Sequence, residues 1–313
     1  MVNYYVFCPK LIGVQTSYNS FKWVFGRKAP VVDKSNFEEC LIKLRIAVDN
    51  DKKIALRCKN FADRFGDYYG NFGGNAVLFN KQLKILGNIA YEISVSDNTV
   101  DVVIGKRYLR YVKYKFMHLH PMYYILFDFV SAMLLKRGYL PIYSSAVKLK
   151  SGKTAVMIAP PNTGKSLTSL KLVNDYGALP IAEDVAVTDG ERIWSVPYTD
   201  TYRNYGRFVS NINRSFNEEP ERIDCLYWLS HGDSNIVTIS EQEFPKMQIV
   251  NDYLLSYAKS PAIDAFCFFN GCFKNTELLE IERSIILKMF ANINASFIFE
   301  NNALRYADVI ASL

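Results

Sequence analysis

The sequence predicts an α/β protein built from two domains. Residues 1–120 contain mostly short segments rich in β-branched and aromatic residues, which are typical of strands. Residues 121–313 alternate strand-like and helix-like segments, and one uninterrupted apolar run there is typical of a strand buried on both faces of a sheet. We therefore expect a β-rich α+β N-terminal domain over 1–120, followed by an α/β domain over 121–313.

Composition agrees with two globular domains that bind an anion. The chain has 313 residues, of which 50% are hydrophobic and 22% are charged, so it can form substantial apolar cores. Its formal net charge is +6 at pH 7. This modest excess suits an anionic ligand, and because the basic residues are spread along the chain, we expect no nucleic-acid partner.

Cysteine usage and hydrophobic runs predict a cytoplasmic protein. The six cysteines show no CxxC pair, which favours reduced thiols over structural zinc. The opening stretch MVNYYVFCPKLIG lacks the basic-then-apolar order of a signal peptide. The most apolar run, MYYILFDFVSAMLL, is interrupted by Asp128 and is shorter than the roughly 20 residues that a membrane span needs. We expect no membrane partner.

The N-terminal domain is predicted to hold several short strands and a covering helix. Residues 53–58, 91–96, 99–105 and 107–116 are rich in β-branched and aromatic residues and partly alternate, so we expect strands there. Residues 37–48 have helical spacing and are expected to cover one face of the sheet.

The C-terminal domain begins with a predicted helix over about 121–137. A tight turn at Ser151-Gly152 then leads into a buried strand over about 154–158. After a loop, an amphipathic segment ends at Gly177, which is a typical helix C-cap. A strand leading into two acids and a hairpin at Asp189-Gly190 follow. Beyond the hairpin we expect strands over 223–230 and 234–240 and helices over 244–258, 276–293 and 302–313.

The loop APPNTGKSLT, residues 159–168, closely matches the phosphate-binding pattern, with Ala159 at its first glycine position. In such a loop the backbone N–H groups surround the phosphates, Lys165 contacts the outer phosphates, and the Ser166 hydroxyl can bind Mg²⁺. Gly164 permits a close backbone approach, and Ala159 is tolerated where the backbone angles are ordinary. The residues expected to contact the nucleotide are Pro161, Asn162, Thr163, Gly164, Lys165, Ser166 and Leu167.

The alternative to a phosphate loop is a plain turn whose Asn or Thr caps a helix. The strand before the loop, the helix after it and the acids downstream together favour phosphate binding. We take Lys165 to be an exposed loop side chain, so its replacement by alanine should weaken triphosphate binding and hardly change stability.

Glu183 and Asp184 form a second candidate constellation, at the end of the strand that follows the loop helix. Two carboxylates beside a phosphate loop can divide two tasks, one binding Mg²⁺ and the other accepting a proton from an attacking hydroxyl. The alternative is a pair of solvated acids at a strand end. The neighbouring loop favours the catalytic interpretation.

With these elements in place, residues 139–197 resemble the HPr kinase/phosphorylase-related kinases, which share a fold and a phosphate loop with the ATP-dependent phosphoenolpyruvate carboxykinases. Ala182-Glu183-Asp184 stands where that family has Ala-Asp-Asp, and Tyr143-Ser144-Ser145-Ala146-Val147 stands where it has a histidine-containing strand. The resemblance implies a P-loop kinase domain with a mixed sheet, and it places Glu183 at the catalytic aspartate.

This chain departs from the family in three ways. Glu183 reaches one methylene further than aspartate, which leaves open which acid is the base and which serves the metal. Tyr143 replaces the histidine, so we do not carry over the phosphorylase activity. No equivalent of the HPr kinase's own C-terminal signature is present, which argues against HPr as the acceptor.

We therefore expect an ATP-dependent phosphotransferase that moves the γ-phosphoryl group to a hydroxyl, with serine of a peptide or protein as the preferred acceptor. Lys165, Glu183 and Asp184 would be catalytic, with Glu183 as proton acceptor and Asp184 and Ser166 as Mg²⁺ ligands. The alternatives are a nucleotide-binding regulatory or assembly module and a small-molecule kinase. GTP or pyrophosphate as donor, and a homo-oligomeric state, remain open.

Overall fold

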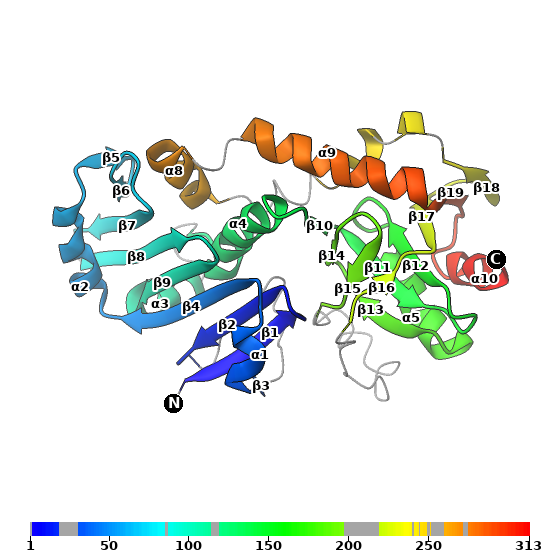
Figure 1. The fold of residues 1–313 in the computed structure, drawn as a ribbon, viewed down its shortest axis with the longest axis horizontal. Helices are drawn as coiled ribbons and strands as arrows, with labels where there is room; N and C mark the ends of the chain where they lie inside the picture. Colours follow the sequence, from blue (N-terminus) through cyan, green and yellow to red (C-terminus); the bar gives the residue numbers. More distant parts are fainter. Residues whose placement is uncertain are drawn as a thin grey trace. The chain divides into compact units, whose positions relative to one another are not determined.

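The computed structural model of the chain describes residues 2–18, 31–84, 87–113, 119–196, 219–239, 241–243, 245–248, 251, 260–271 and 275–313. The protein is mixed α/β and divides into two compact units (Figure 1). Unit 1 comprises residues 1–24, 29–133 and 257–278, and unit 2 comprises residues 25–28, 134–256 and 279–313.

Unit 1 contains a mixed nine-stranded sheet in the order β3-β1-β2-β4-β9-β8-β7-β6-β5. The pairs β2–β4 and β4–β9 run parallel, and the others run antiparallel. The strands are β1 (Asn3–Cys8), β2 (Ile12–Thr16), β3 (Val31–Val32), β4 (Ile42–Asp49), β5 (Asp63–Phe65), β6 (Tyr68–Gly70), β7 (Ala76–Leu83), β8 (Gly87–Ser96) and β9 (Thr99–Gly105). The helices are α1 (Lys34–Glu38), α2 (Asp51–Leu56), the 3₁₀ helix η2 (Arg57–Asn60), α3 (Lys106–Lys113), α4 (Met122–Leu135, up to residue 133) and α8 (Pro261–Asn270).

The sequence-based strands over 91–96 and 99–105 are confirmed as parts of β8 and β9. The helix predicted over 37–48 is wrong, because this stretch holds the end of α1 and then β4. Its apolar residues Ile42, Leu44 and Ile46 alternate with more exposed ones, and all three are buried. This spacing has a period of two, which is that of a strand with one face on the core.

The strand predicted over 53–58 is also wrong, since helix α2 and η2 occupy it. Asn50 caps α2, because its side-chain oxygen accepts the N–H of Lys52 at 2.9 Å. Ile54 is fully buried and packs with Leu78 and Ala90 of the sheet. The cap and this contact favour a helix over the strand that residue composition alone suggested.

Residues 106–113 form helix α3, so the strand predicted over 107–116 is wrong for its described part. The carboxylate of Asp51, only 2% exposed, accepts the N–H groups of Arg107 at 2.7 Å and Tyr108 at 3.3 Å. It also accepts the N–H of Ala90 at 3.0 Å. Because the first N–H groups of a helix lack partners within the helix, this remote carboxylate stabilises the start of α3.

We expect Asp51→Asn to lower the free energy of unfolding by about 2 kcal/mol, because an amide places a donor where Asp51 Oδ2 now accepts a backbone N–H. Chemical denaturation measures this loss. Asp101→Asn is the control, since Asp101 is half-exposed and lies 4.0 Å from Arg45. An equal, small effect of both substitutions would contradict the structural role of Asp51.

Helix α8 packs with the N-terminal sheet, although it follows that sheet by more than a hundred residues in the sequence. The N–H of Gly73 donates to Phe269 O at 2.8 Å, and the rings of Phe129 and Phe266 lie 5.3 Å apart. The compact units therefore differ from the sequence-based division at residue 120, since most of α4 and all of α8 pack with the N-terminal sheet.

Unit 2 contains a six-stranded mixed sheet in the order β13-β11-β12-β17-β19-β18 and a four-stranded antiparallel sheet in the order β10-β14-β15-β16. In the larger sheet, β12, β17 and β19 run parallel. The strands are β10 (Leu140–Ile142), β11 (Ser144–Lys148), β12 (Thr154–Ile158), β13 (Leu179–Ala182), β14 (Ala186–Thr188), β15 (Arg192–Trp194), β16 (Glu221–Arg222), β17 (Cys225–Ser230), β18 (Asn235–Thr238) and β19 (Asn294–Phe299). Its helices include α5 (Lys165–Tyr176), α9 (Asn275–Asn292, from residue 279) and α10 (Arg305–Ser312).

The order of elements predicted around the loop is confirmed. Strand β12 is buried at every residue, α5 ends at Tyr176 with Gly177 as its C-cap, and β14 and β15 form the hairpin. Helices α4, α9 and α10 lie where helices were expected, and residues 245–248 of the helix expected over 244–258 are helical. The rest of that segment, apart from the helical residue 251, lies outside the described residues.

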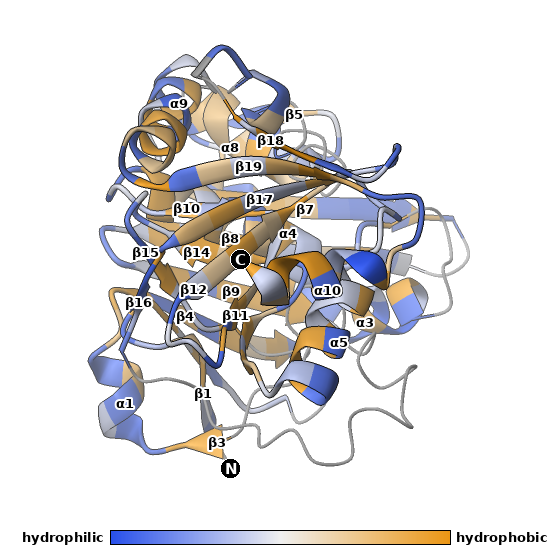
Figure 2. Cartoon of the chain, turned by 90° about the vertical axis from the view of Figure 1, so that its right-hand side faces the viewer, coloured by the Kyte–Doolittle hydropathy of each residue, from blue (hydrophilic) through white to orange (hydrophobic). Residues whose placement is uncertain are grey.

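Helices α5 and α10 lie side by side and pack on one face of the larger sheet (Figure 2). Ala155 and Met157 of β12 point to this face, where they join Leu172 of α5 and Tyr306 and Ile310 of α10 in one buried cluster. The packing holds the start of α5 close to the end of β12.

Within the described residues, no helix is long and apolar enough to cross a membrane. The five cysteines described there carry free thiols.

Candidate functional site

The loop between β12 and α5 adopts two left-handed backbone positions, at Asn162 with φ of 66° and at Gly164 with φ of 110°. Asparagine and glycine are the residues that tolerate this region best. Ala159 is not among the positive-φ residues. Alanine at the first glycine position is therefore compatible with this loop, as expected.

Gly164 is required by packing as well as by its backbone angle. A Cβ added at this position would lie 2.5 Å from Cβ of Ala303, which precedes α10. The neighbouring Thr168 hydroxyl donates to Ala303 O at 3.2 Å and to Gly164 O at 3.0 Å. The sequence suggested a glycine that admits a ligand, whereas the described contact is with the protein's own chain.

The start of α5 presents backbone donors at the loop. The first hydrogen bond of the helix runs from Thr168 N–H to Gly164 O at 2.9 Å. The N–H groups of Lys165, Ser166 and Leu167 therefore precede the first hydrogen bond of the helix and can donate to an anion.

Lys165 is the first residue of α5, and its side chain is enclosed beside the loop, so that only 4% of the residue is exposed. Its Nζ donates to Ala159 O at 3.0 Å and lies 3.6 Å from the centre of the Tyr143 ring. Burial lowers the pKa of Lys165 to about 7, against the opposing effect of the Asp184 charge. The expectation of an exposed lysine is therefore wrong. Because a buried amine costs free energy when it is charged, we now expect Lys165 to influence stability.

The pH dependence of stability should report this buried amine. Between about pH 7 and about pH 10.5 the unfolded chain protonates Lys165 and the folded chain does not. The free energy of unfolding should therefore rise with pH, by up to about 1.4 kcal/mol per unit for this group. Chemical denaturation at pH 7 and pH 9 measures the rise. The rise should shrink in Lys165→Met by the contribution of that group, and an unchanged rise would contradict the lowered pKa.

Glu183 and Asp184 follow β13 in a tight turn. The N–H of Val185 donates to Glu183 O at 2.7 Å, and Asp184 between them has φ of 60°. A three-residue turn with positive φ at a non-glycine residue is uncommon and strained. The N–H of Ser144 donates to Asp184 O at 3.1 Å, which ties the turn to β11.

The two acids share the electrostatic environment of Lys165 and Tyr143. Burial, together with the charges of Asp184 and Glu183, raises the pKa of Tyr143 to about 12. Glu183 is fully buried, and Asp184 is partly exposed. The structure thus brings together Tyr143, Lys165, Glu183 and Asp184.

The remaining loop residues differ in exposure. Thr163 is buried, and its hydroxyl donates to Pro160 O at 2.9 Å, whereas Pro161 and Asn162 are exposed. Ser166 is half-buried. Among the described residues no hydrogen bond joins Ser166 to Asp184, the two residues expected to bind Mg²⁺.

Sequence reasoning missed the support beneath Tyr143. The Tyr143 N–H donates to Asn251 Oδ1 at 3.0 Å, and Asn251 Nδ2 donates to Glu282 Oε1 of α9 at 2.6 Å. Asn251 and Glu282 are 3% and 2% exposed. This network forms only when three distant segments of the chain lie together. No local sequence pattern indicates that an asparagine or a glutamate takes part in it.

The described residues contain no group of three or more His, Cys, Asp or Glu side chains arranged to hold a metal. Mg²⁺ in nucleotide sites needs fewer protein ligands, because it binds one or two carboxylates together with phosphates. The carboxylate of Asp184 and the hydroxyl of Ser166 both offer oxygen ligands, which are the kind that Mg²⁺ binds.

Comparison with known proteins gives no family for this chain. No protein-family model matches it, and no curated protein matches its sequence significantly.

Proposed function

We propose that this protein is an ATP-dependent phosphotransferase of the P-loop kinase type, which transfers the γ-phosphoryl group to a hydroxyl acceptor. Serine of a peptide or protein is the acceptor class that the motif resemblance favours. The proposal rests on unit 2 alone, where the loop, the helix start and the two acids lie together.

One observation carries the proposal. Lys165 is buried, its pKa is lowered to about 7, and it is the first residue of α5, where three backbone N–H groups precede the first helical hydrogen bond. An anion bound there would restore a partner for the ammonium and accept the N–H groups of Lys165, Ser166 and Leu167. Triphosphate oxygens have the charge and the number of acceptors that this arrangement needs.

The residues present supply the types of group that a metal-bound nucleotide needs. Asp184 is the acid whose charge acts on Lys165, so we assign it with Ser166 to the metal. Mg²⁺ would neutralise charge on the phosphate oxygens. The loop from Pro161 to Leu167 would surround the phosphates, and Lys165 would stabilise negative charge on the transferring group.

Glu183 is assigned as the proton acceptor for the incoming hydroxyl. Its side chain is fully buried, so a hydroxyl reaches it only after neighbouring side chains move. Closure and rearrangement on substrate binding are usual in phosphotransferases, where they also exclude water.

The burial of Glu183 also favours a second candidate function, a nucleotide-binding regulatory or assembly module with little transfer activity. In that case Lys165 and the loop bind nucleotide and no acceptor approaches Glu183.

Incubation with γ-labelled ATP, Mg²⁺ and a lysate of the host tests the proposal. We expect label on a hydroxyl-containing acceptor in amounts that depend on the protein, and no label with Lys165→Met in its place. Nucleotide binding without acceptor labelling would support the regulatory module. Absence of ATP, GTP and pyrophosphate binding would contradict both functions.

A further inference from the structure

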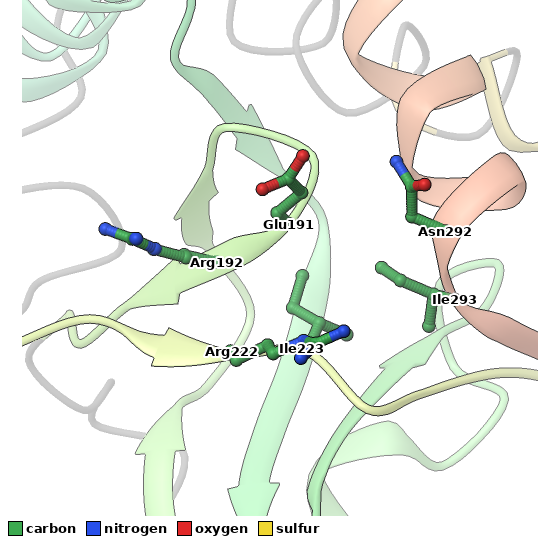
Figure 3. A pocket seen from close by; sticks show the side chains of 6 residues that line it. All are labelled: Glu191, Arg192, Arg222, Ile223, Asn292 and Ile293. Carbon is green, nitrogen blue, oxygen red and sulfur yellow. The ribbon is translucent and has the colours of Figure 1, made fainter.

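A pocket of about 460 Å³ lies in unit 2, between the β14–β15 hairpin, β16 and the end of α9 (Figure 3). Its lining residues are Glu191, Arg192, Arg222, Ile223, Asn292 and Ile293. We propose that this pocket binds a small organic anion through a carboxylate or phosphate group, independently of the nucleotide.

The pocket and the phosphate loop lie at opposite ends of the parallel strands of the larger sheet. Arg222-Ile223 and Asn292-Ile293 shortly precede β17 and β19, so the pocket borders the amino ends of these strands. The loop follows the carboxyl end of β12, which runs parallel to β17. A ligand of the pocket is therefore separate from a nucleotide on the loop.

Two arginines face each other across the antiparallel pair β15–β16. Arg192 and Arg222 are direct partners in the register of these strands. Like charges in this position repel each other, so the two side chains are favoured to extend in different directions. In Figure 3 the Arg222 side chain extends toward Asn292 and Ile293, whereas Arg192 extends to the other side. Arg222 is therefore the principal cation of the pocket.

The nearby acids are engaged elsewhere. Glu191 pairs with Lys288 at 3.1 Å, and Glu221 pairs with Lys148 at 2.9 Å. Asp189 Oδ1 accepts the N–H groups of Glu191 at 2.9 Å and Arg192 at 2.8 Å.

Asp224 is likewise engaged, since its Oδ2 accepts Thr154 N–H at 2.8 Å. Within the described part of the chain, no carboxylate lies within ion-pair distance of Arg192 or Arg222. The Arg222 guanidinium group thus brings positive charge to the pocket that a ligand can balance.

The lining determines the class of ligand. A guanidinium group matches the paired oxygens of a carboxylate or a phosphate. The amide of Asn292, which already donates to Lys288 O at 3.1 Å, adds hydrogen-bonding capacity at the rim. Ile223 and Ile293 are 2% and 8% exposed and offer an apolar floor for the carbon part of a ligand. The volume is that of a small-molecule site.

Calorimetry on the full chain tests the proposal with three probes: inorganic phosphate, succinate and glycerol 3-phosphate. Binding of succinate alone identifies a carboxylate site, and binding of the phosphate probes alone identifies a phosphate site. We expect Arg222→Gln to weaken the best probe about tenfold to a hundredfold. Arg192→Gln should weaken it less, because its side chain extends away from Asn292.

Arg305→Gln is the matched control, because Arg305 is exposed like Arg222 but lies at the start of α10 and does not line the pocket. It should leave the affinity unchanged. Arg222→Lys serves as a second variant, which keeps the charge and loses the planar fork, so it should bind with intermediate affinity. Equal weakening by Arg305→Gln and Arg222→Gln would overturn the proposal, as would the absence of any probe binding tighter than about 10 mM.

Discussion

Lys165→Met is expected to weaken binding of Mg²⁺–ATP by at least about a hundredfold. The substitution removes the buried ammonium and keeps a side chain of similar length, so the loop between β12 and α5 should retain its shape. Calorimetry with Mg²⁺ present measures the affinity. Lys171→Met is the control, since Lys171 lies on the same helix and pairs with Asp308 at the surface.

The same substitution should raise the free energy of unfolding at pH 7 by about 1 kcal/mol or more, because a well-packed apolar side chain replaces a buried charge. Weaker nucleotide binding with higher stability distinguishes a ligand-binding lysine from a structural one. Unchanged affinity for ATP in Lys165→Met would remove the phosphate-loop assignment. Loss of both affinity and stability would instead mean that Lys165 holds the loop together through Ala159 and Tyr143.

Proton uptake should accompany nucleotide binding by the parent protein. With a pKa of about 7, Lys165 is mostly neutral at pH 8.5 and must gain a proton to pair with phosphate. The affinity should therefore fall by up to tenfold per pH unit above about pH 7. Calorimetry in buffers of different ionisation enthalpy measures the uptake, which Lys165→Met should abolish.

Glu183→Gln is expected to lower the rate of phosphoryl transfer by about a thousandfold or more, while nucleotide binding is retained. The amide cannot accept the hydroxyl proton, but it keeps the size of the buried side chain. Asp184→Asn should instead weaken metal-dependent nucleotide binding, because an amide oxygen replaces a charged ligand. Nucleotide titrations with and without Mg²⁺, together with transfer assays, separate the two effects.

Asp189→Asn is a suitable control for the two acids, since an asparagine oxygen can still accept the N–H groups of Glu191 and Arg192. It should change neither binding nor transfer. The reverse pattern in Glu183→Gln and Asp184→Asn would exchange their roles. Normal transfer in both variants would exclude the pair from the mechanism.

Local sequence patterns predict the order of elements around the candidate site. An uninterrupted apolar run predicted β12, Gly177 predicted the end of α5, and Asp189-Gly190 predicted the hairpin. These features depend on backbone preferences and on periodicity within about ten residues, which a sequence displays directly.

Local patterns were less reliable in the N-terminal region, where helices α2 and α3 were predicted as strands. Helix α2 is favoured by the Asn50 cap and by the contact of Ile54 with the sheet, neither of which residue composition reveals. Helix α3 begins where it does because Asp51, from a distant segment, accepts the N–H groups of Arg107 and Tyr108. No window of neighbouring residues contains that information.

The chemistry of Lys165 depends on contacts that no local sequence pattern reveals. The sequence predicted a lysine at a loop, but its burial depends on Tyr143, and the lowered pKa follows from that burial. Tyr143 is tied in turn to Asn251 and Glu282, which lie 108 and 139 residues further along the chain. Burial and charge depend on whatever the fold brings within a few ångströms, so they become known only when distant segments are in place.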